Sequence, residues 1–202
     1  MRSKCLLPWT MKGMRRMSKI KITDKEMKKI REFADARLGS ANHYKSRGGF
    51  KRGDLIAGAM GELAVYKLLR KAGHELRKPD FEIYDKKDKS FDADLRLGKK
   101  RLHVKSQTKD SSSKYGRSWL MQRHDPMFKG TGVNHYLVCT EVDEENMEVE
   151  VLGFFSLHSI LKKGLIGECK VPIFRRTKVA IYFDRLCEGI NDKMRWRICE
   201  KK

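Results

Sequence analysis

Three side chains in this sequence have the types and the spacing needed to hydrolyse a phosphate ester with the help of a metal ion. Glu62 is the only acid in residues 55–74, an apolar segment with helical periodicity. Asp94 and Lys105 lie in "DADLRLGKKRLHVKSQ", where a turn at residues 98–100 joins two strand-like runs. A carboxylate among apolar residues is costly unless it is paired or binds a metal. Two carboxylates can hold a hard divalent ion, and a lysine can orient water or stabilise charge at phosphorus.

The hairpin pattern predicts that Asp94 and Lys105 stand on adjacent antiparallel strands. Because side chains alternate along a strand, both can point to one end and one face of the hairpin if the turn permits it. The same residues are also compatible with a cross-strand ion pair on a solvated face. Glu62 is likewise compatible with an ordinary exposed position on a helix.

The elements that must position these residues follow a mixed helix and strand pattern. Thr23 and Glu26 form a capping-box pattern at the start of a helix that ends at Gly39, and a second helix covers residues 54–72. Gly58 and Gly61 interrupt this second helix, and close packing against a sheet would explain their presence. Residues 108–131 are expected to form a long polar connection. A short helix is expected in "LHSILKKG", and strands are expected at residues 81–85, 93–97, 101–107, 135–142, 148–156 and in "KVAIYF".

The charge of the chain points to a polyanionic partner. Lys and Arg number 46 against 26 Asp and Glu, which gives a formal net charge of +20. A charge this large favours nucleic acid as the partner. No run of about 18 apolar residues is present, so we expect no membrane span. The residues expected to bind nucleic acid are Lys45, Arg47, Lys51, Arg52, Lys99, Lys100, Arg101, Lys109, Lys114, Arg117, Trp119 and Gln122.

The order of the candidate residues resembles the PD-(D/E)XK nuclease superfamily. A helix Glu is followed by an Asp, a short hairpin and then Lys, and "GELAVYKLL" and "DLRLGKKRLHVKS" carry the likeness within residues 54–155. The resemblance implies an α/β fold with a restriction-endonuclease-like core, a mixed central β-sheet flanked by helices. It also implies that Glu62 is an accessory ligand of Mg²⁺ or Mn²⁺, Asp94 the principal ligand and Lys105 the catalytic lysine. The backbone carbonyl of Val104 is implied as a further ligand.

The sequence departs from that family at His103, where the family has Glu or Asp. Three interpretations follow. His103 could ligate a softer ion such as manganese, it could accept a proton or contact phosphate, or the site could have lost its chemistry. Gln107 is a further site candidate because it follows Lys105 on the same strand face.

Two other aspartates compete with Asp94 or support it. Asp80 belongs to a literal "PD" at residues 79–80, but Asp94 keeps the tight hairpin and is preferred. Asp92 is expected to support Asp94 from the same strand face. His124 and His135 have no partners at the spacing of a metal site, so neither is expected to act in one.

The sequence therefore predicts a metal-dependent endonuclease that acts on DNA, with a catalytically inactive nucleic-acid-binding module on the same fold as the alternative. Residues 1–22 are expected to be a disordered basic extension and residues 23–202 a single domain. Five scattered cysteines without CxxC spacing argue against a zinc ribbon or a disulfide framework and fit a cytoplasmic protein. The resemblance also suggests a homodimer.

Overall fold

A mixed five-stranded sheet organises the computed structural model, which describes residues 18–39, 52–82, 93–125, 128 and 134–190. Its strand order is β1-β6-β5-β3-β2. The neighbours β3 and β5 run parallel, and the other three pairs run antiparallel. The strands span Ser18–Lys21 (β1), Leu95–Leu97 (β2), Lys100–Thr108 (β3), His135–Asp143 (β5) and Glu148–Ser156 (β6).

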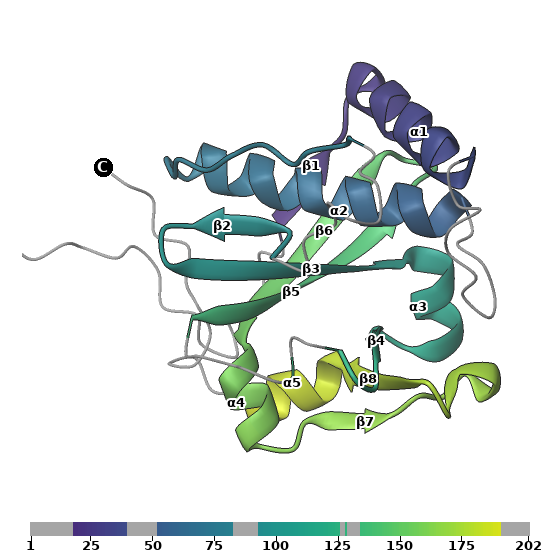
Figure 1. The fold of residues 1–202 in the computed structure, drawn as a ribbon, viewed down its shortest axis with the longest axis vertical. Helices are drawn as coiled ribbons and strands as arrows, with labels where there is room; N and C mark the ends of the chain where they lie inside the picture. The colour runs from purple at the N-terminus through teal and green to yellow at the C-terminus, as the bar shows by residue number, and fades with distance from the viewer. Residues whose placement is uncertain (1–17, 40–51, 83–92, 126–127, 129–133, 191–202) are drawn as a thin grey trace, which may run out of the picture.

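Two helices, α1 (Asp24–Gly39) and α2 (Arg52–Lys71), cover one face of this sheet (Figure 1). The capping box at the start of α1 is confirmed. The Thr23 hydroxyl accepts the Glu26 N–H at 3.3 Å, and the Glu26 carboxylate accepts the Thr23 N–H at 2.8 Å. Lys67 of α2 donates to the same carboxylate at 2.8 Å, which ties the two helices together.

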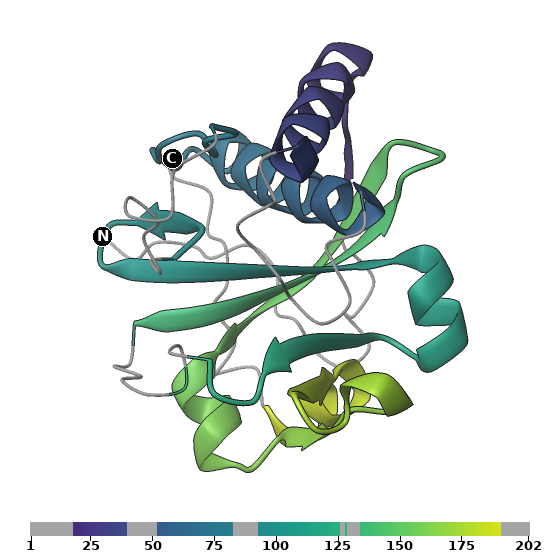
Figure 2. The ribbon, with the colours of Figure 1, turned by 45° about the vertical axis from the view of Figure 1, so that its right-hand side comes forward.

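The other face of the sheet packs against a smaller antiparallel sheet of order β4-β8-β7 and against two short helices (Figure 2). Trp119, Phe155 and Leu157 are among the buried side chains between these layers. The elements of this half are α3 (Lys109–Tyr115), β4 (Ser118–Gln122), α4 (Leu157–Lys162), β7 (Ile166–Glu168), the 3-10 helix η4 (Pro172–Phe174), β8 (Lys178–Tyr182) and α5 (Phe183–Gly189).

The fold class is confirmed as α/β with a mixed sheet flanked by helices, but three local predictions differ from the structure. The polar stretch 108–131 is not one long connection, because it contains α3 and β4. The last residues of the expected extension 1–22 form β1, which pairs with β6. Phe81 and Glu82 do not form a strand, and residues 83–85 lie outside the described residues.

Gly61 lets α2 approach the sheet at the position of Glu62. A Cβ atom at Gly61 would lie 2.0 Å from the Ser106 hydroxyl and 2.8 Å from the Thr140 hydroxyl. These two hydroxyls are themselves hydrogen-bonded at 2.9 Å. Close packing therefore explains Gly61, whereas no neighbouring atom lies within 4 Å of a Cβ at Gly58.

We predict opposite effects for the two glycines of α2. Gly61→Ala would displace the hydroxyls of Ser106 and Thr140 and should lower the free energy of unfolding by about 1–3 kcal/mol. Gly58→Ala fills open space and should raise it by up to about 1 kcal/mol, because alanine is the better helix former. Urea unfolding followed by circular dichroism measures both. Equal effects of the two substitutions would contradict close packing at Gly61.

Candidate active site

Asp94 stands where the short strand β2 begins. The turn between β2 and β3 uses Gly98 at φ +54°, a left-handed conformation that favours glycine. Leu95 pairs with Leu102 in the antiparallel register, so one further step places Asp94 opposite His103. The Asp94 carboxylate accepts the backbone N–H of Val104 at 2.7 Å. This hydrogen bond fixes the carboxylate against β3.

Lys105 and His103 alternate along β3 with buried Leu102 and Val104, which pack under α2. Lys105 and His103 are half-buried, and alternation along the strand places their Cβ atoms on the face of β3 that points away from α2. The positive charge of Lys105 nevertheless lowers the pKa of both Glu62 and Asp94. The three predicted residues therefore lie close enough for their charges to interact.

Glu62 is half-buried on α2, and the negative charge of Asp94 acts on it. Burial, followed by the negative charge of Asp94, raises the pKa of Glu62 to about 8, and Lys105 opposes this shift only in part. Burial also raises the pKa of Asp94, against the lowering effects of Lys105 and the Val104 N–H. Asp94 is exposed at its surface, so water weakens the effect of burial there. The two carboxyls disfavour each other's charge, an arrangement that a bound cation would relieve.

His103 meets His135, which the sequence did not assign to any site. The His103 Nε2 and His135 Nδ1 atoms are 3.0 Å apart, and the ring planes differ by 13° with centroids 5.2 Å apart. The two nitrogens are much closer than the ring centroids, so the rings approach each other through these atoms. This is the geometry of a hydrogen bond between neutral rings. Burial and the His135 ring lower the pKa of His103 to about 4.

Parallel pairing of β3 and β5 explains why the two histidines meet. Arg101 is the register partner of His135, so His135 lies near the start of the β3 segment that carries His103. The residues are far apart in sequence, and no sequence signal specifies this register. His124, by contrast, is exposed.

The donor set near β3 consists of two carboxylates. Among the residues that the structure describes, no group of three or more His, Cys, Asp or Glu side chains has the geometry to hold a metal ion. Glu62 and Asp94 provide carboxylate oxygens, and Mg²⁺ is commonly held by one or two carboxylates with water and substrate phosphate completing its shell. The His103 Nε2 atom is already engaged by His135. The set fits a hard ion better than a soft one.

Asp125 is a third acid near the site that the sequence analysis missed. Its charge acts on both Asp94 and His103, raising the pKa of each. Asp125 follows β4, where its N–H donates to the Gln122 carbonyl at 3.0 Å. No strand was expected in this region, so nothing in the sequence placed Asp125 beside the hairpin.

Asp80 does not join the site. It is exposed, its carboxylate accepts the N–H of Glu82 at 2.9 Å, and it lies 3.8 Å from the Arg77 guanidinium. These local contacts favour Asp94 over Asp80 as the aspartate of the site. Asp92 lies outside the described residues.

The side chain of Gln107 takes part in structural contacts, and its catalytic role stays a prediction. Its side chain is buried, its amide nitrogen donates to the Gly116 carbonyl at 3.0 Å, and its amide oxygen accepts the Ser118 N–H at 2.7 Å. Gln107 therefore anchors the segment that leads from α3 into β4. Strand periodicity gives the face of a residue but not what covers that face, so the sequence did not reveal these contacts.

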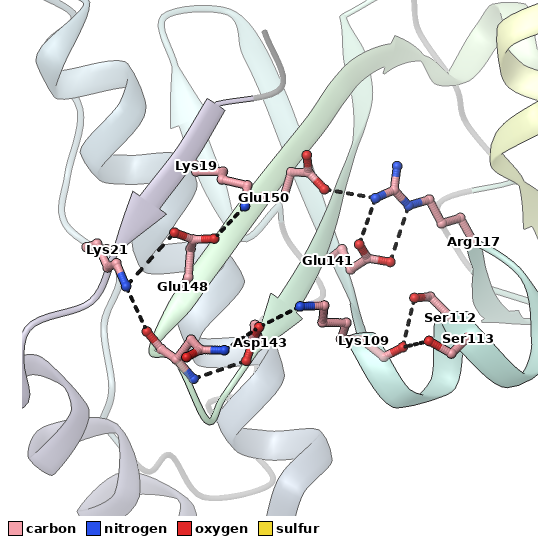
Figure 3. Close-up of polar contacts among 11 residues, drawn as sticks. Lys19, Lys21, Lys109, Ser112, Ser113, Arg117, Glu141, Asp143, Glu148 and Glu150 are labelled. Atoms are coloured by element: carbon pink, nitrogen blue, oxygen red, sulfur yellow. Dashed lines mark hydrogen bonds and ion pairs between the residues drawn. The ribbon is translucent and has the colours of Figure 1, made fainter. Parts of the chain in front are cut away.

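Two residues expected to bind nucleic acid are instead paired with acids of the β5–β6 hairpin (Figure 3). Arg117 donates to Glu141 at 2.8 and 3.2 Å and to Glu150 at 2.9 Å. Lys109 lies 2.9 Å from Asp143. The acids of this hairpin neutralise neighbouring cations. Their charge is thus largely compensated within the fold, and contacts of Arg117 and Lys109 with nucleic acid stay a prediction.

Trp119 cannot stack on nucleotides as the sequence suggested. Its side chain is 1% exposed, and its indole N–H donates to the Thr140 carbonyl at 3.1 Å. The mixture of aromatic and basic residues indicated a surface loop, but Trp119 lies on β4 and packs in the core.

The remaining candidates for nucleic-acid contacts fall into three groups. Arg52 is exposed and forms a fork with Asp35, with one of its two hydrogen bonds at 2.9 Å. Lys45, Arg47 and Lys51 lie outside the described residues. Lys99, Arg101, Lys114 and Gln122 are exposed, and Lys100 is half-buried.

Comparison with known proteins adds no assignment. A scan against models of protein families gives no match, and searches among curated proteins and among solved structures give none either. Within the described part of the chain, no helix has both the length and the apolar character needed to cross a membrane.

We predict that Glu62 makes stability fall as the pH rises. In the folded chain Glu62 keeps its proton to about pH 8, whereas in the unfolded chain it releases it near 4.5. The folded state therefore binds more protons between these values, and its free energy of unfolding should decrease across them by about 1.4 kcal/mol per unit of pKa shift.

Urea unfolding in EDTA between about pH 5 and pH 8 measures this effect. Glu62→Gln should flatten the decrease and be more stable than wild type at the upper end. Glu32→Gln, which changes an exposed acid of α1, is the matched control and should leave the slope unchanged. A wild-type slope that survives in Glu62→Gln would contradict the assignment.

We also predict that Arg117 stabilises the fold. Glu141 and Glu150 are register partners on β5 and β6, so Arg117→Ala leaves two carboxylates side by side without their cation. The free energy of unfolding should fall by about 1–3 kcal/mol. Lys114→Ala, at an exposed position of α3, should change it by less than about 0.5 kcal/mol. Similar values for both variants in urea unfolding would rule out this role.

Proposed function

We propose that this protein is a metal-dependent nuclease with a restriction-endonuclease-like core. The observation that carries the proposal is the mutual electrostatic effect of Glu62, Asp94 and Lys105, which come from three different elements of the fold. A simple phosphate-binding protein has no reason to hold two carboxylates beside a lysine. These three residues are also the ones whose order along the chain resembles the PD-(D/E)XK superfamily.

Glu62 and Asp94 would hold the divalent ion, Mg²⁺ or Mn²⁺, through their carboxylate oxygens. The raised pKa of each carboxyl supports this role, because burial disfavours their charged forms and a bound cation would stabilise those forms. An ion bound there polarises the phosphate and lowers the pKa of bound water. The Val104 N–H holds Asp94 in place at 2.7 Å. The Val104 carbonyl remains a proposed ligand.

Lys105 is the residue that we expect to act on the reacting groups. Its ammonium can orient the attacking water or stabilise the charge that develops on the phosphate. The Nε2 atom of His103 is engaged by His135, which supports a role as phosphate contact over a role as metal ligand. The pKa of His103, lowered to about 4, disfavours a role as proton acceptor.

DNA is the proposed substrate. The net charge of +20 supports a nucleic-acid partner. On the β2–β3 hairpin, Lys99 and Arg101 are exposed next to the site, where they can contact phosphates. The cytoplasmic location and the homodimer remain predictions.

A catalytically inactive DNA-binding module is the second candidate. It is favoured by the replacement of an acid by His103, and by the engagement of the His103 Nε2 atom with His135. In this case the carboxylates would be a remnant, and only binding to nucleic acid would survive.

We predict that the purified protein cuts DNA in Mg²⁺ or Mn²⁺ and that EDTA abolishes the cutting. Lys105→Ala should reduce the single-turnover rate by about 100-fold or more. Lys99→Ala, on the same hairpin, removes the same charge at an exposed position and should change mainly the affinity. Supercoiled plasmid and end-labelled oligonucleotides serve as substrates.

The outcome separates the two candidates. Cutting that disappears in Lys105→Ala but persists in Lys99→Ala supports the nuclease. Salt-sensitive binding without cutting in either metal supports the inactive module. Cutting that is equal in wild type and Lys105→Ala would assign the activity to a contaminant and contradict the proposal.

A further inference from the structure

The turn between β7 and β8 combines an exposed apolar side chain with uncompensated positive charge. We define residues 170–178, "KVPIFRRTK", as the basic turn; it contains four cations and no acid. Ile173 at its tip is 80% exposed and is the one large hydrophobic residue of the described chain with such exposure. The turn projects from the edge of the smaller sheet (Figure 1).

The basic turn is held in shape by its own hydrogen bonds. Pro172 starts the 3-10 helix η4, the Phe174 N–H donates to the Val171 carbonyl at 3.0 Å, and the Thr177 N–H donates to the Phe174 carbonyl at 3.0 Å. Arg123 donates to the Arg175 carbonyl at 3.0 Å from the end of β4. Ile173 is thus presented outward on an ordered turn.

The cations of the basic turn lack the acids that neutralise other cations of the protein. Lys170, Arg175 and Arg176 are exposed, and none of them forms an ion pair with a carboxylate of the described residues. Lys178 instead lies over the Phe174 ring at 4.3 Å, and Lys170 lies over the Tyr182 ring. At the β5–β6 hairpin, by contrast, Lys19, Lys109 and Arg117 all form ion pairs with carboxylates.

A short piece of chain connects the basic turn to the candidate active site. Gln122 of β4 is the register partner of Lys178, and Arg123 contacts the Arg175 carbonyl. Two residues further on, Asp125 is close enough to raise the pKa of Asp94. The basic turn is therefore joined to the neighbourhood of the candidate site by the residues that follow β4.

We infer that the basic turn binds double-stranded DNA, with Ile173 inserted into the minor groove and Arg175 and Arg176 on the flanking phosphates. Apolar wedges of this kind enter between base steps and bend the duplex, while neighbouring cations contact its backbone. The inference rests on the proposed function for its nucleic-acid partner and narrows the substrate to a duplex. It does not require that the site cuts.

An anionic membrane surface is a less suitable partner. One exposed isoleucine offers little apolar area, and stable membrane attachment takes a large amphipathic face or two anchoring signals. Binding to a membrane would also not explain why the basic turn lies near the carboxylates of the candidate site through the end of β4. A duplex uses both the cations and the wedge.

The test measures binding of the full-length protein to a fluorescein-labelled duplex in EDTA, by anisotropy over a range of salt concentrations. Arg175→Gln/Arg176→Gln should weaken binding about tenfold and reduce the slope of log K against log salt by about 1.8, the value for two phosphate contacts. Lys28→Gln/Lys29→Gln removes the same charge from exposed positions of α1 and should leave the slope nearly unchanged.

A second measurement isolates the wedge. Ile173→Ser should weaken duplex binding several-fold without changing the salt slope, and it should reduce bending of an end-labelled duplex in energy-transfer measurements. Binding to a single strand of the same sequence should not change. Unchanged thermal unfolding midpoints would show that the variants are folded, as expected for exposed positions.

The outcomes distinguish this inference from the proposed function. Loss of duplex binding and bending in the turn variants supports the inference even if wild type cuts no DNA. Wild-type binding and bending in all turn variants overturns it, and cutting of DNA would then leave the nuclease proposal intact. Absence of duplex binding by wild type also overturns it. Loss of binding to phosphatidylserine vesicles, with duplex binding unchanged, would assign the turn to a membrane instead.

Discussion

The contact of α2 with the sheet at Gly61 is the constraint on which the candidate site depends. A helix carrying any side chain at that position would stand further from the hydroxyls of Ser106 and Thr140. Glu62 is the next residue, so the same separation would move its carboxyl away from Asp94 and Lys105. The close approach of α2 to the sheet at Gly61 therefore affects both the stability of the helix and the electrostatics of the site. Glycine is the suitable residue there, although its helix propensity is poor, because it has no side chain.

The charges of this chain are divided into two kinds of surface. At the β5–β6 hairpin, acids and bases neutralise each other, and the interactions there stabilise the arrangement of β1, α3 and the strands (Figure 3). At the basic turn, by contrast, the exposed Lys170, Arg175 and Arg176 form no ion pair with a carboxylate of the described residues. A net charge alone does not locate a binding surface, because an arginine that forms a fork with a glutamate contributes mainly to the fold.

Sequence patterns predicted the elements with long periodic signals and failed where contacts between distant segments decide the structure. Both long helices, and the strands with clear alternation, are present close to their predicted bounds. Residues 109–115 were missed because "KDSSSKY" has the composition of a loop, although the Thr108 hydroxyl caps it as a helix. The burial of Trp119 and the pairing of His103 with His135 depend on sheet register and layer packing. Neither is specified by the local sequence.

The short length of β2 has a consequence for how the protein avoids self-association. β2 has three residues and β3 has nine, so β3 extends beyond its partner at the point where Asp94 takes the Val104 N–H. An unpaired strand edge is a template on which the strand of another molecule can add. A carboxylate bound to that edge occupies a donor and repels incoming backbone carbonyls. The hydrogen bond from the Val104 N–H to Asp94 thus makes this position of β3 a poorer template for a second strand, independently of any reaction at the site.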